Sequence, residues 1–197
     1  AKMISDIASQ ATNVVIFFAI AFILTVLAVY WYSRSWTLTF LPLICSLTSL
    51  VWQFGMLEIL GYGLDPLAIL VPFLVFAIGV SHGIQQVNQI TKEVIDGKSA
   101  EYAARASFSR LIIPGSMALI TDLVGFGTLI LLPITMIKEL AITAAIGVAF
   151  KIVTNLGMLP LAASYARYNE SFAISAQSAI LYRQNLMGFF GKLARPR

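Results

Sequence analysis

Charged residues are scarce in this sequence of 197 residues, of which 11% are charged and 59% are hydrophobic. About a quarter of the residues of an ordinary soluble domain are charged, so this composition excludes that class and indicates a chain that lies in lipid. The formal net charge is +4. The basic residues do not form a patch with interleaved aromatic side chains, which argues against nucleic acid as a partner.

Cysteine and histidine are scarcer still, because the sequence has one of each. Cys45 lies in an apolar run without a second cysteine, which excludes a disulfide framework within this chain. Cys45 and His82 cannot build a metal site on their own. The sequence also lacks a nucleophile motif and a glycine-rich phosphate loop. We therefore expect neither an enzyme nor a protein with a metal or another cofactor.

Long apolar runs make up most of the chain. Each of five runs could cross a hydrocarbon core about 30 Å thick, which takes about 20 helical residues. These runs cover about 13–32, 37–60, 66–90, 111–132 and 140–164. The sequence therefore predicts an all-α membrane protein. Residues 1–12 are expected to end a periplasmic segment, 13–165 to form a five-helix transmembrane unit, and 166–197 to form a cytoplasmic tail.

Lysine and arginine lie mainly on one side of this predicted bundle. Alternate loops and the tail place ten basic residues on one side and two, Lys2 and Lys138, on the other. The ten are Arg34, Lys92, Lys98, Arg105, Arg110, Arg167, Arg183, Lys192, Arg195 and Arg197. Because basic residues concentrate on the cytoplasmic side, we expect the N-terminus in the periplasm and the C-terminus in the cytoplasm.

Two polar segments mix charged and apolar residues. The segment 91–110 is predicted to form short amphipathic turns on the membrane surface. The tail, from Glu170 to Arg197, is predicted to form an amphipathic helix on the cytoplasmic interface, where anionic lipids attract its basic residues. Membrane lipids are thus expected partners of both segments.

Three ionisable residues lie within the apolar runs. Asp122 lies about 16 Å into its run and Lys151 about 15 Å into the next, so both reach mid-depth, while His82 follows Ser81 in the third run. A charge in the hydrocarbon costs about 2.5–3.5 kcal/mol or more. We therefore expect Asp122 and Lys151 to face one another, with His82 nearby. They form either a structural ion pair or a proton-coupling site.

Small residues near these positions predict close packing between helices. Gly79 and Gly83 form a G-x-x-x-G pair in the third run, and Gly125 and Gly147 lie in the fourth and fifth. Such spacing is common in membrane helices and by itself indicates only that helices touch.

Three motifs, in order and spacing, resemble the first half of RND-superfamily exporters of the MMPL and hydrophobe-exporter type. Residues 78–84 with Gln85 and Asn88 resemble the fourth transmembrane helix of the family. The pairs Thr121-Asp122 and Gly125-Phe126 resemble the fifth, and Asn155 with Leu159-Pro160 resembles the end of the sixth. Over about residues 5–165, the chain is similar to helices two to six, a unit that resembles a sterol-sensing domain.

The resemblance implies half of the membrane domain of a proton-driven exporter of hydrophobic or lipid-like molecules in a cell inner membrane. It also implies an oligomer and further parts of the same protein, namely a periplasmic domain and a second half. Ser81 and His82 occupy positions where the family often has Asp followed by Tyr or Phe. The proton-carrying role would then fall to Asp122 and His82 or to the second half. Two alternatives are a sterol-sensing-like lipid-binding or regulatory module and a membrane scaffold held by neighbouring subunits.

Overall fold

A computed structural model describes residues 2–62, 70–168, 172–174, 176–178 and 180–181, with side chains from residue 15 onward. Over these residues the long elements are all helices: α1 (Lys2–Ser33), α2 (Trp36–Ile59), α3 (Val71–Ile95), α4 (Ala100–Leu129) and α5 (Thr135–Lys151). A π-helix, η2 (Ile152–Met158), and α6 (Leu159–Ser164) continue α5 without a break. The described part of the chain is therefore all-α, as the sequence predicts.

Four of these helices are long and apolar enough to cross a membrane. They are Val15–Ser33, Trp36–Ile59, Ala100–Leu129 and Thr135–Ser164. Helix α3 has 25 residues, which give it a length of about 37 Å, but its second half is rich in polar side chains and it is not among the four. A fifth span at 66–90 stays a prediction, and part of that range lies outside the described residues.

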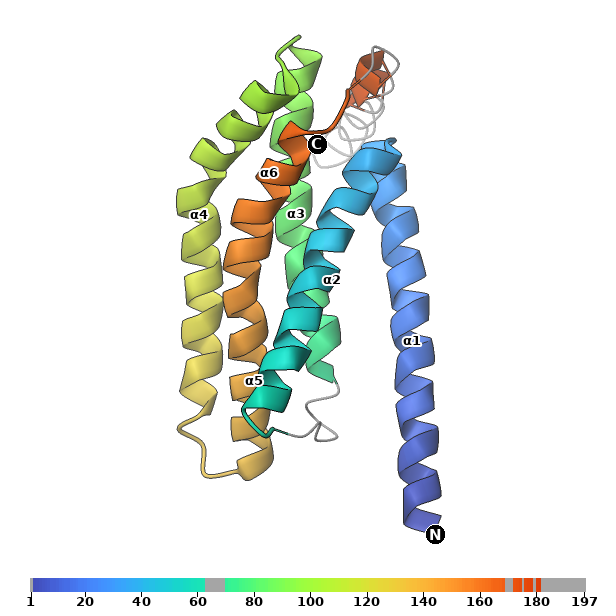
Figure 1. Cartoon of the computed structure of the whole chain (residues 1–197), viewed down its shortest axis with the longest axis vertical. Coiled ribbons are helices and arrows are strands. Elements are labelled where there is room, and N and C mark those ends of the chain that lie inside the picture. Colours follow the sequence, from blue (N-terminus) through green and yellow to red (C-terminus); the bar gives the residue numbers. More distant parts are fainter. Residues whose placement is uncertain (1, 63–69, 169–171, 175, 179, 182–197) are drawn as a thin grey trace, which may run out of the picture.

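Helices α2, α3, α4 and the continuous α5–α6 run side by side, while α1 lies at the edge of this bundle (Figure 1). Helix α1 packs through aromatic rings: the Phe18 and Phe22 centroids each lie 5.7 Å from that of Phe76 on α3. Its other face is apolar and exposed, with Phe17 64% and Leu24 60% accessible. Such a surface on a helix fits contact with lipid.

One end of the bundle carries the turns after α1 and α3 and the end of α6 (Figure 1, top). We call it the basic end because its turns and helix ends hold Arg34, Lys92, Lys98, Arg105, Arg110 and Arg167. The side chains of Ser35 and Ser99 cap the helices that start there, accepting hydrogen bonds from the Leu38 and Tyr102 backbone amides.

The segment 91–110 is not a separate surface element, and that part of the sequence-based prediction is wrong. Helix α3 continues to Ile95, and α4 begins at Ala100 and runs for 30 residues. Gly97, with φ +78°, ends α3 in a Schellman motif, in which the Gly97 amide bonds to Val94 O and the Lys98 amide to Glu93 O. The charges of this segment therefore belong to the ends of two long helices.

The predicted interfacial tail lies mostly outside the described residues, which in that region are 172–174, 176–178 and 180–181. Phe172 packs against Tyr168 with ring centroids 5.2 Å apart, and both contact the buried cluster at the basic end that includes Ala163. The interfacial helix over 166–197 stays a prediction.

Candidate functional site

Lys151, the last residue of α5, has no exposed surface. Its Nζ donates a hydrogen bond to the Ser46 carbonyl oxygen of α2 at 3.1 Å. Among the described residues, no carboxylate oxygen lies within 4 Å of this nitrogen. The neighbours of this buried lysine are thus neutral groups, although an opposite charge would offset the cost of burying its ammonium group most effectively.

Gly79 of α3 leaves the space that the Lys151 side chain fills. A Cβ at this position would collide with Lys151 Nζ and would come within 2.6 Å of both Lys151 Cε and Ser46 Oγ. The Ser46 hydroxyl is buried and has no hydrogen-bond partner among the residues that the structure describes. Three helices therefore converge near Gly79, where the Lys151 side chain and the Ser46 hydroxyl both lie close to the position that a Cβ would take.

A chain of hydrogen bonds continues from this point toward the basic end. Asn155 Nδ2 donates to the Gly79 carbonyl oxygen, and Gln86 Nε2 donates to the Asn155 carbonyl oxygen at 3.1 Å. Ser107 Oγ of α4 then donates to Gln86 Oε1 at 3.0 Å. The three side chains are at most 1% exposed. A buried polar network of this kind fixes how the helices pack, because an unpaired member would be costly.

Polar groups also lie beyond both ends of this network. Toward the basic end, Glu93 is bound to Arg110 Nη1 at 2.6 Å and accepts a hydrogen bond from Gln89. Toward the other end, Gln53 Nε2 donates to the Thr143 carbonyl oxygen at 2.9 Å, while Gln53 Oε1 is buried and meets no donor within the described part of the chain. Polar side chains thus follow the interior of the bundle over most of its length.

We call this set the polar file: Ser46, Ser49, Gln53, Gln86, Glu93, Ser107, Thr143, Lys151, Thr154 and Asn155, all buried. Its members recur at helical spacing, at 46, 49 and 53 on α2 and at 143, 151 and 155 along α5 and η2. Residues at this spacing share one face of a helix. That periodicity is visible in the sequence and could have identified Ser46 and Gln53, which a search for charged residues does not find.

The π-helix η2 begins directly after Lys151. The amide of Leu159 bonds to the Thr154 carbonyl oxygen, five residues earlier, and Pro160 next to it has no amide hydrogen to restore the α-helical pattern. Single π-turns inside α-helices are rare overall, and many of them lie at functional sites. Here the wider turn places Thr154 and Asn155 together in the polar file.

The structure places the other predicted site residues elsewhere. Asp122 of α4 and His82 of α3 are both partly buried, and Asp122 forms no ion pair with Lys151. Ser81 is exposed. Lys151 therefore belongs to the polar file, and Asp122 does not.

The predicted packing glycines also differ from one another. A Cβ at Gly83 would collide with Pro42 Cβ, and one at Gly147 would lie 2.7 Å from Val75 Cγ2 and from the Gln53 side chain. At Gly125, a Cβ would meet no neighbouring residue within 4 Å. Gly79, Gly83 and Gly147 thus lie where helices approach closely, and Gly125 does not.

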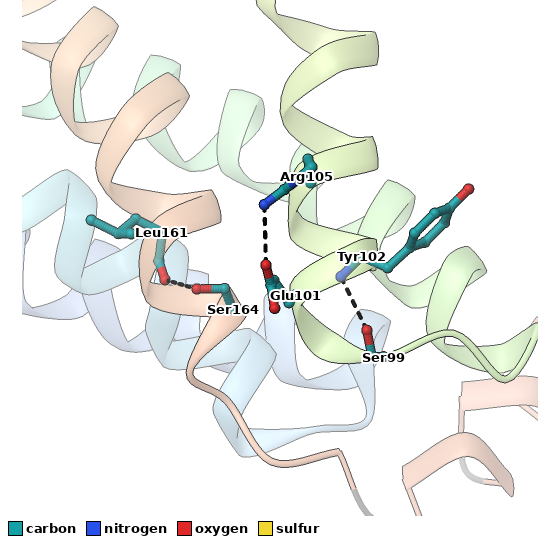
Figure 2. Close-up of polar contacts among 6 residues, drawn as sticks. All are labelled: Ser99, Glu101, Tyr102, Arg105, Leu161 and Ser164. Atoms are coloured by element: carbon teal, nitrogen blue, oxygen red, sulfur yellow. Dashed lines mark hydrogen bonds and ion pairs between the residues drawn. The ribbon is translucent and has the colours of Figure 1, made fainter.

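A groove of about 520 Å³ opens at the basic end between α4 and the helix formed by η2 and α6. Its walls include Arg105, Phe108, Gly157, Leu161 and Tyr165. Figure 2 shows Arg105 and Glu101 pointing from α4 toward α6, while Tyr102 points away. The groove is separate from the polar file and faces outward.

Comparison with known proteins identifies the fold family. Residues 31–160 match the family model described as the sterol-sensing domain of SREBP cleavage-activation. The chain is also 23% identical, over 159 residues, to the membrane protein MJ1562 of Methanocaldococcus jannaschii, an alignment that covers 81% of this chain and 40% of that relative. The chain thus spans about two fifths of the length of the curated relative it matches. It is a multi-pass membrane protein that belongs to the sterol-sensing domain family.

Proposed function

We propose that this chain is a membrane module of a longer, proton-driven RND-type exporter that moves hydrophobic or lipid-like molecules. The observation that carries the proposal is Lys151, which is fully buried within the polar file and has no carboxylate partner among the described residues. The membership of the sterol-sensing domain family and the order of the three motifs support it.

The chemistry follows from the cost of an uncompensated buried charge, which is several kcal/mol. A protonated Lys151 requires an opposite charge, and the second half of the protein would supply it in one state of the transport cycle. In the other state Lys151 is neutral, having released its proton to water on one side of the membrane. Each protonation state then favours a different packing of α2, α3 and α5 around Gly79, which couples proton passage to movement of the helices.

The proposal includes the arrangement of the whole protein. Five helices cross an inner membrane, the basic end faces the cytoplasm together with the C-terminus, and the N-terminus is periplasmic. A periplasmic domain, a second half and other copies of the protein complete the exporter. Asp122 and His82 form a second proton-handling pair between α3 and α4.

The test uses the full-length protein in liposomes with an imposed pH gradient and follows the movement of a fluorescent hydrophobic dye. Lys151→Met keeps most of the side-chain volume and removes the charge, so it should abolish gradient-dependent movement while the protein still elutes as a folded species. Lys138→Gln, an exposed lysine in the first turn of α5, is the matched control and should transport normally. Unchanged transport by Lys151→Met would contradict the proposal.

A second candidate function is a sterol-sensing-like lipid-binding or regulatory module that transports nothing. The outward-facing groove between α4 and α6 favours it, because a lipid could bind there without crossing the membrane. In that case the wild-type protein should move no dye under a pH gradient, and added lipid should raise its thermal stability through binding to the folded state.

A further inference from the structure

We propose that the groove between α4 and α6 binds a membrane phospholipid whose headgroup carries both a phosphate and a primary ammonium, as in phosphatidylethanolamine. This site goes beyond the proposed transport function. It lies outside the polar file and does not require that its ligand be the exported molecule.

The charged groups of the groove match such a headgroup. Arg105 Nη2 lies 3.1 Å from Glu101 Oε1, and the two side chains are 78% and 74% exposed. An exposed pair of this kind contributes little stability, so opening it for a ligand costs little. The guanidinium offers two parallel N–H donors to a phosphate, and the carboxylate accepts hydrogen bonds from an ammonium. A phosphate and an ammonium side by side would therefore replace both partners.

The rest of the groove fits the glycerol and the acyl chains. Leu161 is 61% exposed and Phe108 41% exposed, and both line the cavity beyond the charged pair. Tyr165, 82% exposed, lies just past the end of α6, where an amphipathic ring suits the boundary between hydrocarbon and headgroups. A free phosphate would use only Arg105, whereas a phospholipid would use the charged and the apolar parts together.

The π-helix makes room for this ligand. Gly157 lines the groove, and no heavy atom lies within 4 Å of the place where its Cβ would be. A volume of about 520 Å³ is within the range of small-molecule sites, about 300–1,000 Å³. The groove can therefore hold a headgroup and the first part of the acyl chains, and the remainder would lie against exposed apolar side chains of the bundle.

The experiment measures lipid retention by native mass spectrometry of the delipidated full-length protein. Phosphatidylethanolamine, phosphatidylcholine and phosphatidylglycerol with identical acyl chains are added in turn. Phosphatidylcholine lacks N–H donors for Glu101, and phosphatidylglycerol lacks the cation. The wild-type protein should retain phosphatidylethanolamine about 10-fold better than either, as expected for one charge-assisted hydrogen bond.

Three variants test the individual parts of the site. Arg105→Gln should lower retention of phosphatidylethanolamine about 10-fold, and Glu101→Gln should remove the preference over phosphatidylcholine. Gly157→Leu, which adds a side chain at a lining position where a Cβ has open space, should weaken retention of all three lipids. Lys92→Gln, which removes an exposed charge of the basic end outside the groove, should behave as wild type.

Equal retention of the three lipids by the wild-type protein would overturn the proposal. A preference for phosphatidylglycerol, or unchanged retention in Arg105→Gln or Gly157→Leu, would do the same. The outcome is independent of the proposed transport function, because the lipid measurement needs no pH gradient and no transported dye.

Discussion

Replacing Gly79 with alanine tests the geometry around Lys151 most directly. The added methyl group would collide with Lys151 Nζ and would lie 2.6 Å from both Lys151 Cε and Ser46 Oγ. The lysine side chain must then move, and its hydrogen bond to the Ser46 carbonyl oxygen must lengthen or break. The fully buried neighbours leave little space into which it could shift.

Two terms give the size of the effect. Overpacking of a close-packed interior costs about 1–3 kcal/mol, and loss of a hydrogen bond from a charged donor costs about 1.5–3 kcal/mol. Alanine gains about 0.5–1 kcal/mol over glycine inside a helix. The expected net loss in the free energy of unfolding for Gly79→Ala is therefore about 2–5 kcal/mol.

Gly125→Ala is the matched control, because Gly125 also lies in a long helix but has open space around its Cβ position. It should be neutral or should stabilise the protein by about 0.5–1 kcal/mol. Unfolding of the purified protein in mixed micelles with increasing SDS measures both variants. The free energy of unfolding should fall in Gly79→Ala and should not fall in Gly125→Ala. This difference distinguishes a local collision from a general effect of adding a methyl group.

The double variant Gly79→Ala with Lys151→Ala identifies the collision partner. Lys151→Ala removes the atoms of the lysine that the new methyl group would meet. Gly79→Ala should therefore lower the free energy of unfolding less in the Lys151→Ala protein than in the wild type, with a coupling energy of about 1–3 kcal/mol. Equal stabilities of the Gly79→Ala and Gly125→Ala proteins would refute the reasoning, as would a coupling energy near zero.

Two further predictions concern the basic end. Arg110→Gln should lower the free energy of unfolding by about 1–3 kcal/mol, because it leaves the buried Glu93 carboxylate without its cation. Arg105→Gln, which breaks an exposed pair, should cost about 0–1 kcal/mol in the same SDS titration, and equal losses would contradict this difference. Burial raises the pKa of Tyr168 to about 12, so the folded protein keeps the phenol proton that the unfolded chain loses near pH 10. Stability should therefore fall as the pH rises from about 10 to about 12, and Tyr168→Phe should remove this loss.

The sequence by itself determined the class of the protein and the local structure. Scarce charge and long apolar runs require helices in lipid, since backbone groups in hydrocarbon must bond within the chain. Ser35, Gly97 and Ser99 lie at helix ends in the structure, because caps and left-handed turns depend on the residues beside them. The sequence-based prediction of a surface segment at 91–110 was wrong because the charged ends of two long helices have the same mixed pattern of charged and apolar residues as a surface segment.

Only the tertiary structure decided what Lys151 contacts. The rise per residue places Asp122 and Lys151 at similar depth in their own helices, and depth alone led to the prediction that they pair. The direction of a side chain depends on how each helix is rotated about its axis, and that rotation is set by packing against the neighbouring helices. In the structure it turns Lys151 toward Ser46 and Gly79, and Asp122 forms no ion pair with it.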